Sequence, residues 1–117
     1  MEKKNIDWSS IGFAYMPTDY RYVSNFKDGK WDEGTLSTDP NIVLNECAGV
    51  LQYSQSVFEG LKAYTTEDGH IVTFRPDLNA ERMAASAARL EMPVFPKERF
   101  IDAVEQVVKA NAAWVPP

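Results

Sequence analysis

The sequence is poor in the residues that build disulfides and metal sites. Cys47 is the only cysteine and His70 the only histidine. No internal disulfide can therefore form, and the pair supplies no zinc ligand set, so we expect no metal site. A cysteine-poor chain suits a reducing compartment, and the polar start of the chain has no apolar signal region. We therefore expect a cytoplasmic protein.

Long apolar runs and a surplus of basic residues are also missing. No stretch approaches the roughly 20 apolar residues that cross a bilayer, so membrane association is not expected. Lysine and arginine total 12 against 17 acidic residues, for a net charge of −5, and the basic residues are scattered. A nucleic-acid-binding protein normally presents a basic face, so nucleic acid is not an expected partner.

Glycine-rich phosphate loops and the glycine–serine turn of serine hydrolases are absent as well. What remains is ordinary globular sequence: 117 residues, of which 44% are apolar and 25% charged. This length suits one domain, residues 1–117, with room for one core. It does not suffice for an enclosed cofactor cavity together with a deep substrate pocket.

The first two-thirds of the chain reads as strands and turns. Residues 20–26, 58–64 and 71–74 are rich in β-formers or alternate with period two, which predicts strands. Asp28-Gly29 and Asp68-Gly69 predict hairpin turns, because both positions tolerate positive φ. The breakers in 32–41 predict a loop. Residues 48–58 fit either a short helix or an irregular turn.

The last third has helical periodicity. Met83, Ala87 and Leu90 share one face of a helix predicted over 77–91, with Asp77 as its N-cap, and prolines end it. An apolar stripe predicts a second helix over 97–113. Strands followed by helices favour an α+β fold: a two-layer sandwich of a mainly antiparallel sheet with two helices packed on one face.

Arg82 is the strongest candidate for binding chemistry. It lies early in a helix that begins directly after a strand, and helix starts attract anions. Arginine stays charged and binds phosphate with two hydrogen bonds, so a phosphate site at this junction is physically reasonable. The alternative is a solvated helix residue whose guanidinium pairs with Asp77, Glu81 or Asp102.

Other side chains admit both a functional and a plain structural interpretation. Tyr53 and Phe58 could line an apolar pocket, but aromatic residues more often pack in a core. Lys62 could act as a nucleophile, but its strand pattern predicts an exposed residue. The sequence pattern alone leaves these alternatives open.

Four ordered blocks of the sequence resemble branched-chain amino acid aminotransferases of fold type IV. The segment Leu51–Tyr64, with Phe58-Glu59-Gly60, is similar to the family's Phe-Glu-Gly region. Residues 71–83, with Arg75-Pro76, resemble its strand–Arg-Pro–helix junction, which continues through 86–93. The remaining blocks, 12–20 and 114–116, are similar to the start and the end of its small N-terminal domain.

The resemblance implies a transaminase that moves an amino group between leucine, isoleucine or valine and 2-oxoglutarate, with pyridoxal 5′-phosphate in a cleft between two domains. It implies that Arg82 contacts the cofactor phosphate and that Tyr53, Phe58 and Phe13 contribute to the substrate pocket. It also implies a homodimer with branched-chain amino acids and 2-oxo acids as ligands.

The lysine that holds the cofactor belongs, in that family, to a large C-terminal domain with no counterpart in these 117 residues. Lys62 matches a different family position, so no catalytic residue is assigned here, and we expect the fragment alone to be inactive. Two alternatives stay open: the small domain of a D-amino acid aminotransferase or aminodeoxychorismate lyase, and a non-catalytic interaction or ligand-binding module.

Overall fold

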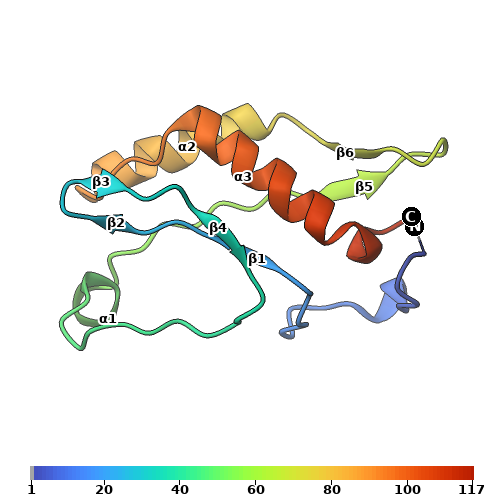
Figure 1. Ribbon diagram of the computed structural model, residues 1–117, viewed down its shortest axis with the longest axis horizontal. Coiled ribbons are helices and arrows are strands. Elements are labelled where there is room, and N and C mark those ends of the chain that lie inside the picture. The colour runs from blue at the N-terminus through green and yellow to red at the C-terminus, as the bar shows by residue number, and fades with distance from the viewer. Residues whose placement is uncertain (1) are drawn as a thin grey trace.

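Two helices of equal length dominate the computed structural model, which describes residues 2–117. Helix α2 (Pro76–Arg89) and helix α3 (Lys97–Ala110) lie side by side along the long axis of the molecule (Figure 1). The face of α2 that packs carries small side chains, and Ala80 and Ala87 are buried. Small residues let the two helix backbones approach closely, so this pair forms the centre of the fold.

The strands form three two-stranded antiparallel ribbons. The pairs are β1 (Arg21–Val23) with β4 (Thr35–Ser37), β2 (Phe26–Lys27) with β3 (Lys30–Trp31), and β5 (Ala63–Thr65) with β6 (Ile71–Thr73). The predicted α+β class and the antiparallel pairing are confirmed. In Figure 1 the ribbon of β1 and β4 runs alongside α3, below it in the view, while β5 and β6 extend beyond the start of α2.

Both predicted hairpins are present, with different turns. Asp28 (φ 53°) and Gly29 (φ 80°) form the two-residue turn between β2 and β3, as their sequence indicates. The turn between β5 and β6 is longer. There only Gly69 has positive φ, and its N–H donates to the carbonyl of Thr66 at 2.9 Å.

The predicted loop over 32–41 is wrong in part, because it contains β4. The carboxylate of Asp32 accepts hydrogen bonds from the N–H groups of Asn25 (3.1 Å) and Gly34 (2.9 Å). Together with the positive φ of Gly34, 74°, these bonds turn the chain back, so that Thr35 pairs with Val23. The same contacts separate β1 from β2, so the strand predicted over 20–26 is interrupted.

The ambiguous region 48–58 begins with a short helix, α1 (Gly49–Tyr53), which ends at Ser54 with φ 53°. The strand predicted over 58–64 is shorter than expected, since regular pairing begins only at Ala63. Residues 54–62 are extended without a strand partner. Their polar contacts go to α2 instead.

The helix ends differ from the prediction in one informative way. Asp77 is not the N-cap of α2: Arg75 holds that position with φ 47°, and Pro76 is the first helical residue. Proline suits this place because its fixed φ is helical and its missing N–H is not needed there. Helix α3 ends at Ala110, and a short 3-10 turn, η2 (Ala112–Trp114), follows it.

Burial is shallow. Among the described residues, the buried apolar side chains are Ala80, Ala87, Ala112 and Val115. Lys4 and the C-terminal residues lie close together near β5 (Figure 1), because the N–H of Lys4 donates to the carbonyl of Ala113 and that of Thr65 donates to the carbonyl of Pro116. A further 3-10 turn, η1 (Trp8–Ser10), follows the N-terminal segment. No helix within residues 2–117 has the length and apolar character to cross a membrane.

Candidate functional site

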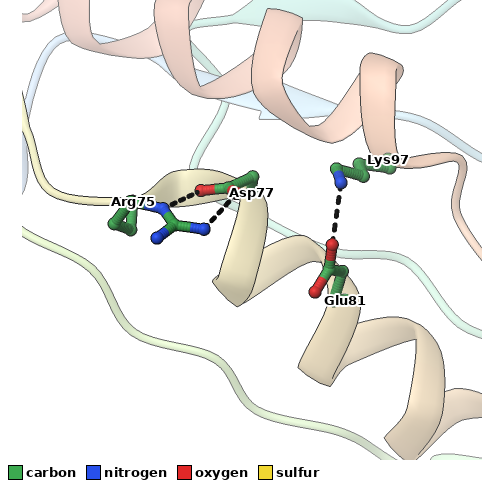
Figure 2. Close-up of polar contacts among 4 residues, drawn as sticks. All are labelled: Arg75, Asp77, Glu81 and Lys97. Carbon is green, nitrogen blue, oxygen red and sulfur yellow. Dashed lines mark hydrogen bonds and ion pairs between the residues drawn. The ribbon is translucent and has the colours of Figure 1, made fainter.

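The start of α2 is already neutralised by a local ion pair. Nε and Nη2 of Arg75 donate to the two carboxylate oxygens of Asp77, at 3.0 and 2.8 Å (Figure 2). This guanidinium lowers the pKa of Asp77 to about 2. The carboxylate in turn raises the pKa of Arg75 above its ordinary value. The negative charge lies in the first turn, where it is favourable for the helix. A free anion therefore meets a helix start that is already occupied.

Arg82 lies farther along α2 and binds a residue distant in sequence. Its Nε donates to Oε1 of Glu59 at 2.7 Å, and its Nη2 donates to Oε2 at 3.1 Å. Such a parallel pair of charge-assisted bonds fixes the plane of the guanidinium. The arginine side chain is 59% exposed and the glutamate side chain only 14%. The carboxylate is thus the more buried member of the ion pair, and the guanidinium faces solvent.

Asn79 holds the glutamate from one turn earlier in α2. Its Nδ2 donates to Oε2 of Glu59 at 2.7 Å and to the carbonyl of Gly60 at 2.9 Å. Asn79 is buried, with 5% of its surface exposed. The hydrogen bonds from Arg82, and secondarily those from Asn79, hold the pKa of Glu59 below its ordinary value. Glu59 is therefore ionised at neutral pH and cannot act as a proton donor there.

The alternative interpretation of Arg82 named the wrong partners, because the three acids that it suggested are engaged elsewhere. Asp77 binds Arg75, and Glu81 binds Lys97 of α3 at 2.8 Å (Figure 2). Asp102 accepts a hydrogen bond from Gln106, one turn along α3. Each of these acids has another partner, and Arg82 binds Glu59 in the segment before β5.

That segment runs along α2 in the opposite direction to the helix. Nε2 of Gln55 donates to the carbonyl of Leu90 at the helix end, and Glu59 and Gly60 meet the second turn. Between these ties lies an open hollow of about 490 Å³. Its lining residues are Ser56, Val57, Phe58, Ala85, Ser86, Arg89 and Leu90. Apolar side chains and one cation, Arg89, therefore line this hollow.

The three predicted pocket aromatics are all solvent-facing. Phe58 is 90% exposed, Tyr53 is 86% exposed, and Phe13 is fully exposed. The structure brings Phe58 close to Arg82, because Glu59 follows Phe58 in the chain and binds the guanidinium. Tyr53 ends α1, at the opposite end of the molecule from residues 11–20, which carry Phe13 (Figure 1). The described structure does not bring Phe13 and Tyr53 together.

Lys62 is exposed, as its strand pattern indicates, and Cys47 is exposed too. His70 lies in the turn between β5 and β6, where its Nδ1 is 3.0 Å from the carboxylate of Asp68. Within residues 2–117 there is no cluster of His, Cys, Asp or Glu that could hold a metal ion. Arg82 with Glu59, next to Phe58, is therefore the arrangement best suited to a ligand.

Sequence reasoning missed Glu59 and Asn79 as members of this site. A usable signal exists: Glu59 is the only acidic residue between 47 and 66, and it directly follows an aromatic candidate. An isolated carboxylate in apolar sequence needs a cation or a set of donors when it is buried. The sequence does not indicate which cation that is, and the structure shows that it is Arg82.

Comparisons with known proteins agree on one group of relatives. The chain is 52% identical over 114 residues to a branched-chain-amino-acid aminotransferase of Haemophilus influenzae, covering 97% of the chain and 33% of that protein. It is 42% identical to the corresponding enzyme of Helicobacter pylori, covering 97% of the chain and 34% of that protein. A methionine aminotransferase of Arabidopsis thaliana is 46% identical, with 97% and 32% covered. No protein-family model matches the chain.

Proposed function

Because the chain is homologous to the N-terminal third of branched-chain amino acid aminotransferases, we propose that it forms the small domain of such a transaminase. The chain spans about a third of the length of the curated relatives it matches. In this proposal it supplies the arginine for the cofactor phosphate and part of the substrate pocket. The reaction transfers an amino group between a branched-chain amino acid and 2-oxoglutarate.

The observation that carries the proposal is the geometry of Arg82. A guanidinium has five N–H donors. Glu59 takes the Nε donor and one on Nη2, so Nη1 and the second Nη2 hydrogen remain on the 59%-exposed side. Two adjacent donors in one fixed plane suit a phosphate group. When bound, pyridoxal phosphate supplies the electron sink that amino-group transfer requires. The residues present thus fit its phosphate end.

The hollow between residues 56–58 and the second half of α2 suits an apolar substrate side chain. A branched aliphatic chain offers no polar group, so the site must recognise it by shape and apolar contact. Val57, Phe58 and Leu90 supply such a wall, and Tyr53 and Phe13 are proposed to join it in the complete active site. The similarity to a methionine aminotransferase extends the proposal to apolar side chains of comparable size.

The rest of the active site lies outside this chain in the proposal. The lysine that holds the cofactor and the carboxylate for its ring nitrogen come from a large C-terminal domain, and the complete enzyme is a homodimer. Arg82 contributes only to binding and orientation of the cofactor. These 117 residues alone are therefore proposed to be inactive.

The proposal is tested by measuring amino-group transfer from L-leucine to 2-oxoglutarate, with pyridoxal phosphate added. The assay compares this chain with a protein of its relatives' full length. Turnover by the long protein alone supports the proposal. Turnover of D-alanine but not L-leucine would instead support a D-amino acid aminotransferase. No turnover and no cofactor binding by the long protein would support a non-catalytic module.

A further inference from the structure

The charge of Arg82 is cancelled before any ligand arrives. Glu59 touches the guanidinium with both carboxylate oxygens, and its side chain is only 14% exposed. It cannot swing away freely, because Asn79 holds Oε2 at 2.7 Å. The nearest ion pairs on α2, those of Asp77 and Glu81, are internally neutral as well. The proposed site for a doubly charged phosphate group thus centres on an arginine whose charge is balanced by that of Glu59.

We propose that Glu59 is a specificity-determining residue that makes the Arg82 site a poor binder of free inorganic anions. This inference rests on the proposed function of Arg82. A free sulfate or phosphate ion must be held by its charge and hydrogen bonds alone. The carboxylate repels it from behind the guanidinium and blocks the Nε edge, which is the most favourable approach for two parallel hydrogen bonds.

A phosphate group carried on a larger molecule is affected less. Its position is already fixed by contacts elsewhere in the cleft, so it does not depend on the net charge at Arg82 for its whole affinity. It needs only two adjacent donors among the three N–H groups, two on Nη1 and one on Nη2, that Glu59 leaves free and keeps in a fixed plane. Glu59 therefore weakens a free anion through both its charge and the blocked Nε edge, whereas it weakens a phosphate group already directed at the Nη edge through its charge alone. The consequence is selection of the cofactor over abundant inorganic phosphate.

The inference predicts an unusual sign for a mutation. Replacing Glu59 by glutamine keeps the size of the side chain and one oxygen that can accept from Arg82, while removing the charge. If Glu59 served only to hold the fold together, this change would disorder Arg82 and weaken anion binding. If Glu59 suppresses free anions, Glu59→Gln strengthens it.

The experiment titrates sulfate into this chain and follows the Nε–Hε resonance of Arg82 by NMR, assigned with Arg82→Lys. Sulfate keeps its double charge across the working pH range. Glu59→Gln is expected to bind sulfate roughly fivefold more tightly than the native chain, the effect of one charge a few ångströms away in water. Glu59→Ala serves as a second variant with the same expected direction. Arg89, which lines the adjoining hollow, reports whether the change is local.

Glu81→Gln is the matched control, because it removes a paired carboxylate from the position next to Arg82. It is expected to change sulfate affinity by less than about twofold, since its charge faces Lys97. Equal or weaker sulfate binding in both Glu59 variants, with the native Arg82 still responding to sulfate, would overturn the inference alone. An Arg82 resonance that ignores sulfate in every variant would also contradict the proposed phosphate role.

Discussion

Asn111 offers the sharpest test of how the N-terminal segment is held. Its Oδ1 accepts from the N–H groups of Asp19 (3.1 Å) and Tyr20 (2.9 Å), and its Nδ2 donates to the carbonyls of Tyr20 and Val107, both at 2.9 Å. One side chain thus ties the segment that carries Phe13 to the end of α3. Asn111→Ala removes all of these bonds at once.

The expected loss follows from the value of a single bond. A neutral hydrogen bond contributes about 0.5–1.5 kcal/mol net, and these lie mostly near solvent, so the low end applies and Asn111→Ala should cost about 2 kcal/mol. For a chain of this size that corresponds to a fall of about 8 °C in Tm. Asn111→Asp keeps the acceptor and loses the donors, so it should lie between native and alanine.

Urea unfolding followed by tryptophan fluorescence and circular dichroism measures this loss. Asn5→Ala is the matched control, because Asn5 is an exposed asparagine in the same N-terminal region, and it should change stability by less than about 0.5 kcal/mol. A loss of that small size for Asn111→Ala would refute the placement of residues 19–20 against α3.

Three further outcomes are expected. Gly34→Ala should cost about 2 kcal/mol or more in urea unfolding, because a Cβ at φ 74° would lie 2.1 Å from Oη of Tyr22; native-like stability would contradict this turn. Asp77 contributes stability that is present above its ordinary pKa of 3.8 and is lost as pH falls through about 2. Asp77→Asn should therefore flatten the acid limb of a stability–pH curve, and an unchanged slope would speak against the pair with Arg75. The 117-residue chain should show no transamination with added pyridoxal phosphate, and turnover that Lys62→Ala abolishes would overturn our assignment of the lysine.

Local sequence signals predicted the parts of the fold that local physics controls. Asp28-Gly29 specified its turn because both positions require positive φ. The apolar periodicity located α2 and α3 to within a few residues. The prediction of Asp77 as the N-cap was wrong because Pro76, whose fixed φ is helical, is the first residue of the helix and Arg75 is therefore the N-cap.

Long-range pairing was the part that sequence could not provide. Nothing near Thr35 indicates that it pairs with Val23. That pairing depends on the carboxylate of Asp32, which accepts hydrogen bonds from the N–H groups of Asn25 and Gly34. The partner of Arg82 was missed for the same reason. Glu59 lies 23 residues away, and only the path of the extended segment along α2 brings them together. The sequence singled out Arg82 as a candidate, but it did not indicate the residue that pairs with it.

The proposed function depends on Arg82 binding the phosphate group of pyridoxal phosphate. The most direct measurement compares pyridoxal phosphate with pyridoxal, which lacks the phosphate, for binding to the full-length protein and its Arg82→Gln variant. Loss of charge-assisted hydrogen bonds should weaken pyridoxal phosphate binding about 10- to 100-fold while pyridoxal binding stays the same. Equal affinity of the variant and the native protein for pyridoxal phosphate would contradict the phosphate-binding role of Arg82.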